Sequence, residues 1–499
     1  MAGLKGCIAE PASARAEDRR SVWDMLLFTV EEVLEVTGGR LLSGEPRGIK
    51  RVCTDSRDVR RGDLFVALAG ERFDGHDFVA TAIGRGAVGA IVQKPVPLPG
   101  AERPAGPGRR AEAAAPFLVK VPDTLAAFQQ LAAHHRSRFR IPLVAVTGSN
   151  GKTTTKDMVA EVLAEWGTVL KTEGNLNNRV GVPQTLFRLT SKHETAVIEM
   201  GVDRKGQTAR LCEIAHPTIG IITNIGPDHL EFFGSLAASA QAKGELLDLL
   251  PPDGAVVLNA DDAYFDYLAS RARCRVLSFG LSPQAEVRAT DIVQDPRRGL
   301  SCKLVLPGRT RGTPVTLAVH GLHNLSNALA AAAVGFLLDM SGVAIARGLA
   351  RFRPASMRSQ IRNWRGIRIV NDCYNANPAS MKAAVALLTE LGAGGRTIAV
   401  LGDMLELGPD SPALHREVGA SVAERGVSHL VACGTLGRGI AEGARAAGMD
   451  EGRIREAADA EAAGGIVKEL ARPGDVVLVK ASRGMKMERA IETLTEKES

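Results

Sequence analysis

The segment at residues 147–155, TGSNGKTTT, holds the residue types best suited to chemistry in this chain. An apolar run at 143–146 precedes it, and a helical pattern that opens at Lys152 and runs to about residue 166 follows it. This order predicts a strand, a tight turn and a helix. Glycines in the turn let N–H groups close around an anion at the helix N-terminus, Lys152 adds positive charge, and the Thr153 hydroxyl can hold Mg²⁺. The segment therefore predicts a site for the phosphates of a nucleoside triphosphate.

The general P-loop pattern has a glycine five residues before Gly151, where this chain has Val146, so the match is to a shorter variant. The alternative is a plain glycine turn in front of a capped helix. Phosphate binding is the better interpretation because the Gly-Lys-Thr run follows directly on a strand. The predicted phosphate-binding residues are Gly148, Ser149, Asn150, Gly151, Lys152, Thr153 and Thr154.

Length and composition indicate a globular protein of several domains. A chain of 499 residues is long enough for about three domains, and its 45% hydrophobic and 24% charged content is ordinary for such proteins. The net charge of +6 is mild, since 62 basic residues face 56 acidic ones. No basic tract is interleaved with aromatic residues, which make up only 4% of the chain, so a nucleic-acid partner is not expected.

Cysteines and terminal sequence indicate the cellular compartment. The seven cysteines are odd in number and form no CxxC pair, which is typical of reduced, mostly buried thiols in a cytoplasmic protein. The first 24 residues lack the apolar core of a signal peptide, and we expect residues 1–24 to be a disordered extension. The longest apolar run, 328–338, is too short to span a membrane, so membrane insertion is not expected.

Alternating strand and helix patterns predict an α/β protein with three domains. We expect a small α/β N-terminal domain at 25–139, a central P-loop domain with a parallel sheet at 140–354, and a C-terminal Rossmann-like domain at 355–499. Residues 95–116 are rich in Pro, Gly and Ala without periodicity, which predicts a flexible insertion.

Three polar residues of the central domain fall where ligands gather in parallel sheets, beyond the carboxyl ends of the strands. Glu199 ends the predicted strand at 195–198, His229 follows the strand at 219–223, and Lys243 lies in an otherwise apolar helix at 236–250. Each has an ordinary alternative: a solvated strand end, a loop histidine, and a lysine on a helix surface. Their combination favours convergence on the phosphate loop.

The segment at 321–327, GLHNLSN, precedes an alanine-rich helix expected at 328–338. Asparagine side chains can pair with the N6 and N7 edge of adenine, although capping of the helix is the alternative. In the predicted C-terminal domain, polar segments follow three strands, which predicts a ligand-facing edge there; they begin at Asp372, Gly402 and Lys480. The polar turn at 54–57 in the N-terminal domain holds a ligand or serves only as a turn.

Together these segments resemble the Mur ligase family of ATP-dependent enzymes that form amide bonds in bacterial cell-wall precursor synthesis. The resemblance extends from about residue 28 to 492. The shared segments are TGSNGKTTT, EMG at 199–201, NIGPDHLE at 224–231 and GLHNLSNALAA at 321–331. Further segments characterise one branch of the family: DSR at 55–57, EGNLNNRVGVP at 173–183, DCYNANPASM at 372–381, LGDMLELG at 401–408 and KASRGMKME at 480–488.

That resemblance implies a reaction and its substrates. ATP would phosphorylate the terminal carboxylate of UDP-N-acetylmuramoyl-tripeptide, and the amine of D-alanyl-D-alanine would attack the resulting acyl phosphate. Two anions must meet, so positioning and charge neutralisation would dominate catalysis and no covalent Ser or Cys nucleophile is required. The resemblance implies catalytic roles for Lys152, Glu199, His229 and Lys243, and a cytoplasmic monomer acting on small molecules.

The family's site residues carry over by position. Thr153 and Glu199 would hold one Mg²⁺, and His229 a second together with Lys243 as a carbamate. His323, Asn324 and Asn327 would lie beside adenine, Asp372 beside the ribose, and Arg358 near the phosphates. The substrate residues implied by the resemblance are Asp55, Ser56 and Arg57 at the uridine end, Asn175, Asn177 and Asn178 at the muramoyl region, and Tyr374, Asn375, Lys480, Ser482 and Arg483 on the closing domain.

Two positions depart from the usual family pattern, and two alternatives remain. Ala481 replaces a glycine, and Met357 stands before Arg358 where glycine is more usual. One alternative is the sister ligase that adds the third amino acid, but no DNPR-type segment follows LGDMLELG. The other is a non-catalytic P-loop protein that binds ATP to hold a partner, which would leave the substrate motifs without a purpose.

Overall fold

The structure is a computed structural model that describes residues 26–70, 73–97, 115–296, 298–309 and 311–496. The expected disordered extension at 1–24 and most of the expected insertion at 95–116 lie outside these residues. The chain divides into two compact units. The first contains the chain through Leu143 with Thr172–Glu194 and Arg210–His216, and the second contains Val144–Lys171, Thr195–Ala209 and Pro217–Ser499.

The first unit holds a five-stranded sheet in the order β1-β5-β4-β3-β2, in which only the β1 and β5 pair is antiparallel. Its strands are β1 (Arg40–Ser43), β2 (Arg51–Cys53), β3 (Asp63–Val66), β4 (Gly89–Val92) and β5 (Phe117–Lys120). The helices of this part are α1 (Val30–Thr37), α2 (Val79–Gly84), α3 (Thr124–Ser137) and α5 (Gly181–Leu186), with a short 3₁₀ turn η2 (Gly75–Phe78). Helix α1 begins where Thr29 and Glu32 form a reciprocal capping box.

The core of the first unit explains why α3 is fixed against the sheet. Phe128 and Leu131 on α3 pack with Phe117 of β5 and Val33 of α1 in one buried cluster. Asp123 caps α3 by accepting hydrogen bonds from the N–H groups of residues 125 and 126.

The second unit contains a nine-stranded sheet in the order β14-β13-β12-β11-β10-β9-β6-β8-β7. Its strands are β6 (Leu143–Thr147), β7 (Val169–Lys171), β8 (Thr195–Glu199), β9 (Ile219–Ile222), β10 (Ala255–Asn259), β11 (Arg275–Gly280), β12 (Val287–Asp295), β13 (Gly299–Val305) and β14 (Thr313–Leu317). Parallel pairing runs from β6 through β9 and β10 to β11, as the alternating pattern predicts. Strands β12 to β14 add antiparallel pairs, which the sequence pattern did not predict.

Helices of the second unit accompany this sheet. They are α4 (Lys152–Leu163), α7 (Leu230–Phe233), α8 (Leu236–Leu249), α9 (Phe265–Arg271), α10 (Leu322–Leu337) and α11 (Gly342–Arg351), whereas α6 (Gln207–Ala215) is divided between the two units. Helices α4 and α10 pack against each other, and Val159 of α4 and Ala332 of α10 share a core with Val146 of β6. The small alanine side chains of α10 let its backbone approach the neighbouring elements closely.

One expected helix boundary is wrong. The alanine-rich helix was expected to begin at residue 328, but α10 begins at Leu322, so Asn324 and Asn327 lie inside its first two turns. The residue at the N-cap is Gly321, with no side-chain capping bond. Polar residues in the first turns hid the helix start, because a helix buried on several sides has no simple amphipathic period.

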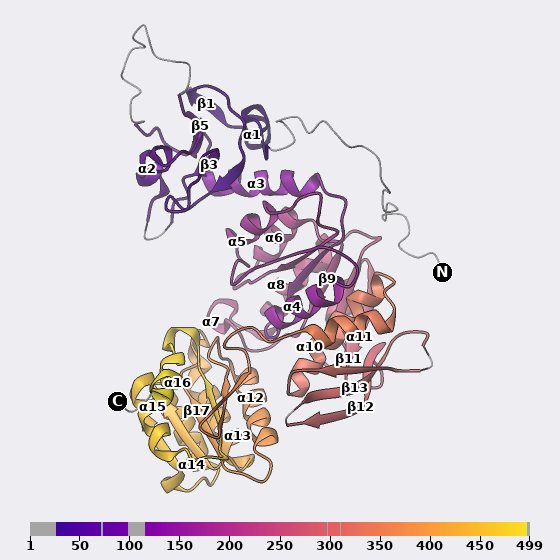
Figure 1. The fold of residues 1–499 in the computed structure, drawn as a ribbon, viewed down its shortest axis with the longest axis vertical. Helices are drawn as coiled ribbons and strands as arrows, with labels where there is room; N and C mark the ends of the chain where they lie inside the picture. Colours follow the sequence, from indigo (N-terminus) through magenta and orange to yellow (C-terminus); the bar gives the residue numbers. More distant parts are fainter. Residues whose placement is uncertain (1–25, 71–72, 98–114, 297, 310, 497–499) are drawn as a thin grey trace. The chain divides into compact units, whose positions relative to one another are not determined.

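A six-stranded sheet in the order β15-β16-β20-β17-β18-β19 completes the second unit, parallel except for the β15 and β16 pair (Figure 1, orange to yellow). Its strands are β15 (Gln360–Trp364), β16 (Ile367–Asn371), β17 (Thr397–Leu401), β18 (His429–Cys433), β19 (Ile454–Ala457) and β20 (Val476–Lys480). Its helices are α12 (Pro378–Leu391), α13 (Ser411–Glu424), α14 (Gly437–Ala446), α15 (Ala460–Leu470) and α16 (Glu488–Thr495).

Side chains of this sheet alternate between two cores. Along β17, Ala399 and Leu401 pack in the core that holds α12, α13 and α14, whereas Ile398 and Val400 pack in the core that holds α15 and α16. Successive side chains of a strand point to opposite faces, so this sheet is covered by helices on both faces. The protein is therefore a mixed α/β fold with three sheets, as the sequence predicts. Among the described residues, no helix is long and apolar enough to cross a membrane.

Candidate active site

The phosphate loop has the predicted strand, turn and helix. All residues of β6 are buried, and the loop enters α4 through Gly151 at the N-cap. Gly148 has φ +135° and Gly151 has φ +80°, conformations that favour glycine. A Cβ on Gly148 would lie 2.0 Å from Thr223 Oγ1, so the backbone has room only for glycine here. The glycine turn leads directly into the N-terminus of α4, where the first N–H groups have no partner within the helix and can bind an anion.

Lys152 folds back over this loop. Its Nζ donates to the carbonyl oxygen of Gly148 at 2.6 Å and to that of Ser149 at 3.1 Å. These carbonyl contacts hold the ammonium beside the turn, and among the described residues no carboxylate forms an ion pair with it. Phosphate oxygens are stronger acceptors for an ammonium than neutral carbonyls, so a bound triphosphate can draw Lys152 toward itself.

The loop after β9 braces the phosphate loop. Asn150 N–H donates to Asn224 Oδ1 at 2.9 Å, and Asn224 Nδ2 donates to the Asn150 carbonyl at 3.1 Å. Thr223 Oγ1 donates to the same carbonyl at 2.6 Å. These contacts explain why the segments at 147–155 and 224–231, far apart in the sequence, form one structure.

A buried ion pair connects the phosphate loop to α8. Lys243 is 1% exposed, which excludes the alternative of a surface lysine, and its Nζ donates to Asp228 Oδ1 at 2.9 Å and to Ser239 Oγ at 2.5 Å. The same Asp228 oxygen accepts a hydrogen bond from Ser149 Oγ at 2.6 Å. The Lys243 ammonium also lies 4.7 Å from the centre of the Phe233 ring.

Burial lowers the pKa of Lys243, and the nearby charge of Lys152 lowers it further, while Asp228 raises it. Asp228 is itself buried, and its Oδ2 has no hydrogen-bond partner among the described residues. A buried carboxylate oxygen of this kind favours a further positive ligand.

Glu199 is buried at the carboxyl end of β8, next to β6 in the sheet. The following residue, Met200, donates its N–H to the Val146 carbonyl at 2.9 Å and accepts from Thr147 Oγ1 at 3.0 Å. The carboxylate is therefore fixed beside the strand that leads into the phosphate loop. The hydroxyl-bearing Thr153 is buried in the first turn of α4.

His229 is turned to a different partner. It has φ +50° at the start of α7, and its Nδ1 lies 2.6 Å from Glu406 Oε2. Among the described residues, no group of three or more His, Cys, Asp and Glu side chains is arranged to hold a metal ion. The oxygen donors around the loop, Thr153, Glu199 and Asp228, are nevertheless of the type that a hard divalent cation prefers.

The two asparagines of α10 reach the phosphate loop. Asn327 Oδ1 accepts from Thr155 Oγ1 at 3.2 Å, and a Cβ on Gly151 would lie 2.3 Å from the same oxygen. Asn324 Oδ1 in turn accepts from Asn327 Nδ2 at 3.4 Å. The structure thus brings together the predicted phosphate and adenine segments.

Asp372 and Lys480 form the centre of the predicted edge of the C-terminal sheet. Lys480 Nζ lies 2.6 Å from Asp372 Oδ2, and Asp372 Oδ1 accepts from the Ser359 N–H at 2.8 Å. Burial lowers the pKa of His323, while the charge of Asp372 raises it and that of Lys480 lowers it. Two of the polar segments that follow strands of this sheet, at Asp372 and at Lys480, therefore lie together.

The remaining predicted residues of this edge have defined contacts. The Arg358 guanidinium lies 3.8 Å from the centre of the Tyr374 ring. Ser482 Oγ accepts from the Leu405 N–H at 2.9 Å. The Asn375 carbonyl accepts a hydrogen bond from Lys480 Nζ at 2.9 Å, and Arg483 Nη1 donates to Glu488 Oε1 at 2.9 Å. Met357, which replaces a family glycine, has φ +60°, and this conformation explains why glycine is usual there.

In the first unit, the DSR turn is an exposed, self-contained motif. Asp55 accepts hydrogen bonds from the backbone and the guanidinium of Arg57, which hold the pKa of its carboxyl at about 2. Arg85 donates to the carbonyl oxygens of Ser56 and Arg57 at 3.1 Å and 2.7 Å. Thr54, the residue before Asp55, accepts a hydrogen bond from Gln184 Nε2 at 3.0 Å, so α5 contacts this turn.

The asparagine-rich segment before α5 is a compact turn. Asn178 Oδ1 accepts from the N–H groups of Val180 and Gly181 at 3.1 Å and 3.0 Å. The Asn175 carbonyl accepts from the Asn177 N–H at 2.8 Å. This segment belongs to the same compact unit as the DSR turn, which groups the two sets of predicted substrate residues.

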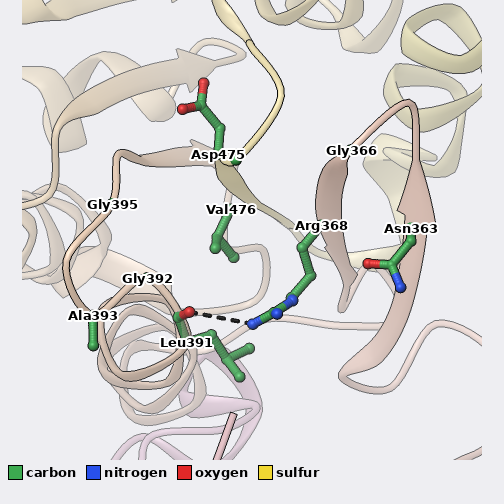
Figure 2. Close-up of a pocket in the computed structure, with 10 residues that line it drawn as sticks. Asn363, Gly366, Arg368, Leu391, Gly392, Ala393, Gly395, Asp475 and Val476 are labelled. Atoms are coloured by element: carbon green, nitrogen blue, oxygen red, sulfur yellow. Dashed lines mark hydrogen bonds between the residues drawn. The ribbon is translucent and has the colours of Figure 1, made fainter. Parts of the chain in front are cut away.

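A shallow cavity of about 180 Å³ lies elsewhere, at the amino ends of β16 and β20 (Figure 2). It is lined by Arg368, which donates to the Leu391 carbonyl at 3.3 Å, and by loops at 392–395 and 474–475. Ligands of parallel sheets gather at the opposite, carboxyl ends of the strands. This cavity is therefore not the candidate active site.

Three residues of the site were not singled out from the sequence. Asp228 lies next to His229 in the quoted segment 224–231, and applying the strand-end rule to the whole loop would have found it. Asn377 caps α12 and its Nδ2 donates to Asn150 Oδ1 at 2.8 Å, a role that a capping pattern conceals. Glu406 carries no local signal, since its contact with His229 is purely tertiary.

The six cysteines that the structure describes form no disulfide with one another, and five of them are buried. Burial raises the pKa of Cys373 to about 12, so this thiol is a weak nucleophile. A covalent cysteine intermediate is accordingly not needed to account for the site.

Three domain families match the chain in succession. They are the Mur ligase family catalytic domain at residues 48–136, the Mur ligase middle domain at 146–335 and the Mur ligase glutamate ligase domain at 357–483. The first match covers the DSR turn, the second the phosphate loop and α10, and the third the edge of the C-terminal sheet.

Known proteins are similar to the chain along nearly its whole length. It is 35% identical over 481 residues to the UDP-N-acetylmuramoyl-tripeptide--D-alanyl-D-alanine ligase of Bacillus subtilis (strain 168), covering 95% of this chain and 99% of that protein. A crystal structure of MurF from Acinetobacter baumannii has a TM-score of 0.83 at 31% identity, covering 94% of this chain and 98% of that one. The MurF ligase of Thermotoga maritima in complex with ADP has a TM-score of 0.78 at 28% identity, covering 89% and 97%.

Proposed function

Because the chain belongs to the Mur ligase family and is an ATP-dependent ligase, we propose that it joins D-alanyl-D-alanine to UDP-N-acetylmuramoyl-tripeptide in bacterial peptidoglycan synthesis. The observation that carries the proposal is the match of 95% of the chain to a ligase of that name. The products are the UDP-muramoyl-pentapeptide, ADP and phosphate.

The reaction proceeds in two balanced steps. The terminal carboxylate of the tripeptide attacks the γ-phosphorus of ATP, and ADP leaves, giving an acyl phosphate. The amine of D-alanyl-D-alanine then attacks the acyl carbon, loses a proton, and inorganic phosphate leaves. Both the carboxylate and the triphosphate are anions, so bringing them together needs concentrated positive charge. Lys152, held by loop carbonyls only 2.6 Å and 3.1 Å away, supplies it at the mouth of the loop.

ATP binds across the phosphate loop and α10. The N–H groups and side chains of residues 148–154 receive the phosphates, His323, Asn324 and Asn327 lie beside adenine, Asp372 beside the ribose, and Arg358 near the phosphates. The hydrogen bond from Thr155 to Asn327, and the effect of the Asp372 and Lys480 charges on the pKa of His323, support one continuous nucleotide site. The ADP complex of the similar Thermotoga maritima ligase also supports nucleotide binding.

Magnesium is the cation that the buried oxygen donors suit. Thr153 and Glu199 hold one ion, and His229 with Lys243 holds a second. Bound Mg²⁺ neutralises phosphate charge and orients the γ-phosphoryl group. The unpartnered Oδ2 of Asp228, beside Lys243, supports a cation in this part of the site.

Lys243 carries a carbamate in the active enzyme. Only the neutral amine reacts with CO₂, and the burial that lowers the Lys243 pKa favours that form. Adding CO₂ to Nζ releases one proton and replaces the ion pair with Asp228 by two adjacent anions. Two buried anions repel each other, so the carbamate would persist only if a bound divalent cation offset that repulsion.

The first unit binds the other end of the peptide substrate. Asp55, Ser56 and Arg57 hold the uridine end, and the segment with Asn175, Asn177 and Asn178 contacts the muramoyl region. Tyr374, Asn375, Lys480, Ser482 and Arg483 contact substrate from the C-terminal domain. The hydrogen bond from Gln184 to Thr54 supports a joint role of the first two groups.

Related proposals concern organisation. We infer domain boundaries at 25–139, 140–354 and 355–499, because each range contains one sheet with its own core. The enzyme acts as a monomer in the cytoplasm, where ATP and UDP-linked precursors are available. The lack of disulfides among the described cysteines is consistent with that compartment.

Phosphate release tests the proposal. With ATP, UDP-muramoyl tripeptide and D-alanyl-D-alanine, Lys152→Ala is expected to slow release at least about 100-fold because one charge at the transferring phosphoryl group is lost. Lys205→Ala, at an exposed lysine of the same unit, serves as the matched control. Pentapeptide formation by Lys152→Ala at the wild-type rate would refute the proposed chemistry.

Two alternatives predict different results in the same assay. A sister ligase would release phosphate with a UDP-muramoyl dipeptide and lysine or diaminopimelate, and not with D-alanyl-D-alanine. A non-catalytic ATP-binding protein would bind ATP and release no phosphate with any amine.

A further inference from the structure

Glu406 lies on a loop that is fixed from several directions. The loop follows β17, and within it the Met404 N–H donates to His415 Nε2 at 2.9 Å and the Leu405 N–H donates to Ser482 Oγ at 2.9 Å. Glu406 has φ +62°, a left-handed conformation that residues other than glycine rarely adopt. Its side chain is 48% exposed and points away from this anchored backbone. A strained residue on a rigid loop suggests that its direction serves a purpose.

That side chain reaches across to the central sheet's site. Glu406 Oε2 lies 2.6 Å from His229 Nδ1, and the Glu406 carbonyl accepts from the Glu231 N–H at 3.2 Å. One residue therefore contacts both the ring of His229 and the backbone that follows it. A second contact from the C-terminal part is the hydrogen bond that Asn377 Nδ2 donates to Asn150 Oδ1 of the phosphate loop at 2.8 Å. The C-terminal sheet thus contacts two predicted nucleotide or metal residues at the same time.

The contact decides which ring nitrogen of His229 is available. An ionised carboxylate only accepts hydrogen bonds, so in the neutral ring the proton lies on Nδ1 and the lone pair on Nε2. A lone pair on Nε2 is what a metal ion needs from imidazole. Histidine ligands commonly donate their other ring N–H to a carboxylate, which fixes the tautomer and orientation.

We propose that Glu406 is the positioning residue of His229, which it holds as the Nδ1–H tautomer with Nε2 open to a divalent cation. The inference rests on the metal role of His229 in the proposed function. Because Glu406 belongs to the C-terminal sheet and His229 to the central one, the metal site is complete only while these two parts of the second unit are docked. Docking of the C-terminal part and cation binding are consequently coupled.

Two readouts test this role without measuring turnover. The first is the tautomer of His229, read from ring ¹⁵N chemical shifts in histidine-labelled protein and assigned by the signal lost in His229→Gln. The second is the affinity for a second Mn²⁺ ion, measured by electron paramagnetic resonance with the full chain saturated by a non-hydrolysable ATP analogue. The variants are Glu406→Ala, Glu406→Gln and the double variant Glu406→Ala/His229→Gln. Glu424→Ala, at an exposed glutamate of α13, is the matched control, and urea unfolding checks that each variant folds.

Glu406→Ala is expected to give mixed tautomers and to weaken the second Mn²⁺ about 10-fold or more. Glu406→Gln, which keeps an acceptor oxygen without the charge, is expected to have a smaller effect. The double variant is expected to bind Mn²⁺ no more weakly than His229→Gln alone, because both changes remove the same ligand.

The contrary outcomes are distinct. If His229→Gln weakens Mn²⁺ binding and Glu406→Ala leaves both the tautomer and the affinity unchanged, the positioning role is wrong and the metal role of His229 stands. If Glu406→Ala tightens Mn²⁺ binding, Glu406 competes with the cation and the inference is overturned. If His229→Gln itself leaves the second Mn²⁺ unaffected, the metal assignment in the proposed function fails, and the inference fails with it.

Discussion

Replacing Gly151 with alanine tests the contact that joins the phosphate loop to α10. The added Cβ would lie 2.3 Å from Asn327 Oδ1, well inside van der Waals contact. Asn327 cannot yield freely, because its Oδ1 accepts from Thr155 and its Nδ2 donates to Asn324. The substitution is therefore expected to disturb the phosphate and adenine parts of the nucleotide site together.

The size of the effect can be worked out against a matched glycine. Gly448 has φ +90° and open space around its Cβ position, so Gly448→Ala carries the backbone strain of a positive φ without a clash. That strain, about 1–2 kcal/mol, is common to both substitutions. Gly151→Ala adds about 1 kcal/mol for a broken hydrogen bond and about 1–3 kcal/mol for overpacking. We expect it to destabilise the protein by about 2–4 kcal/mol more than Gly448→Ala.

Two measurements check this expectation. Urea unfolding is followed by tryptophan fluorescence, to which Trp166 just after α4 contributes, and ATP affinity is measured by titration with a fluorescent analogue. A displaced Asn327 is expected to weaken ATP binding about 10-fold, equivalent to about 1.4 kcal/mol. In an Asn327→Ala background, Gly151→Ala is expected to cost only the strain term. Equal losses for Gly151→Ala and Gly448→Ala, in stability and in ATP affinity, would refute the close contact.

Further predictions concern the buried ion pair, the linking arginine and pH. Asp228→Asn is expected to destabilise the protein by about 3–5 kcal/mol because it leaves the Lys243 ammonium buried without its carboxylate. Urea unfolding of the double variant Asp228→Asn/Lys243→Met should show that part of the lost stability returns. A double variant as unstable as Asp228→Asn would contradict the pairing. Tyr374→Leu is expected to lower kcat/KM for ATP about 3- to 10-fold by removing the ring under Arg358, whereas Tyr374→Phe keeps it; equal losses in steady-state kinetics would assign the effect to the hydroxyl. Burial lowers the pKa of His135 to about 4 in the folded protein, against about 6.5 in the unfolded chain. Between these two pH values the unfolded chain binds a proton that the folded protein does not. The free energy of unfolding therefore falls as the pH falls, by on the order of 3 kcal/mol in total. The stability of His135→Leu should depend less on pH in that window, and an unchanged slope in urea unfolding between pH 7 and 4 would contradict this.

Local sequence patterns predicted most of the strands and helices of the fold. The apolar runs at 143–146, 195–198 and 219–223 predicted strands that the structure confirms, because parallel strands buried on both faces read as continuous hydrophobic segments. The antiparallel strands β12 to β14 escaped detection, since half-exposed strands such as β12 have a mixed pattern that periodicity does not separate from a loop. The start of α10 was misplaced for a related reason: its first turns are polar where they meet the phosphate loop.

The candidate site likewise has one part that the sequence predicted and another that only the structure revealed. The sequence alone determined the phosphate loop, because glycine conformation, a lysine and a helix N-terminus are local properties of adjacent residues. It also pointed to Lys243 and Glu199 by their positions in helix and strand. Only the tertiary structure decided their partners: Asp228 with Lys243, Asn377 with Asn150, and Glu406 with His229. Such pairs join residues up to 227 positions apart in the chain, and the energy that selects them comes from packing and buried charge, which no local pattern encodes.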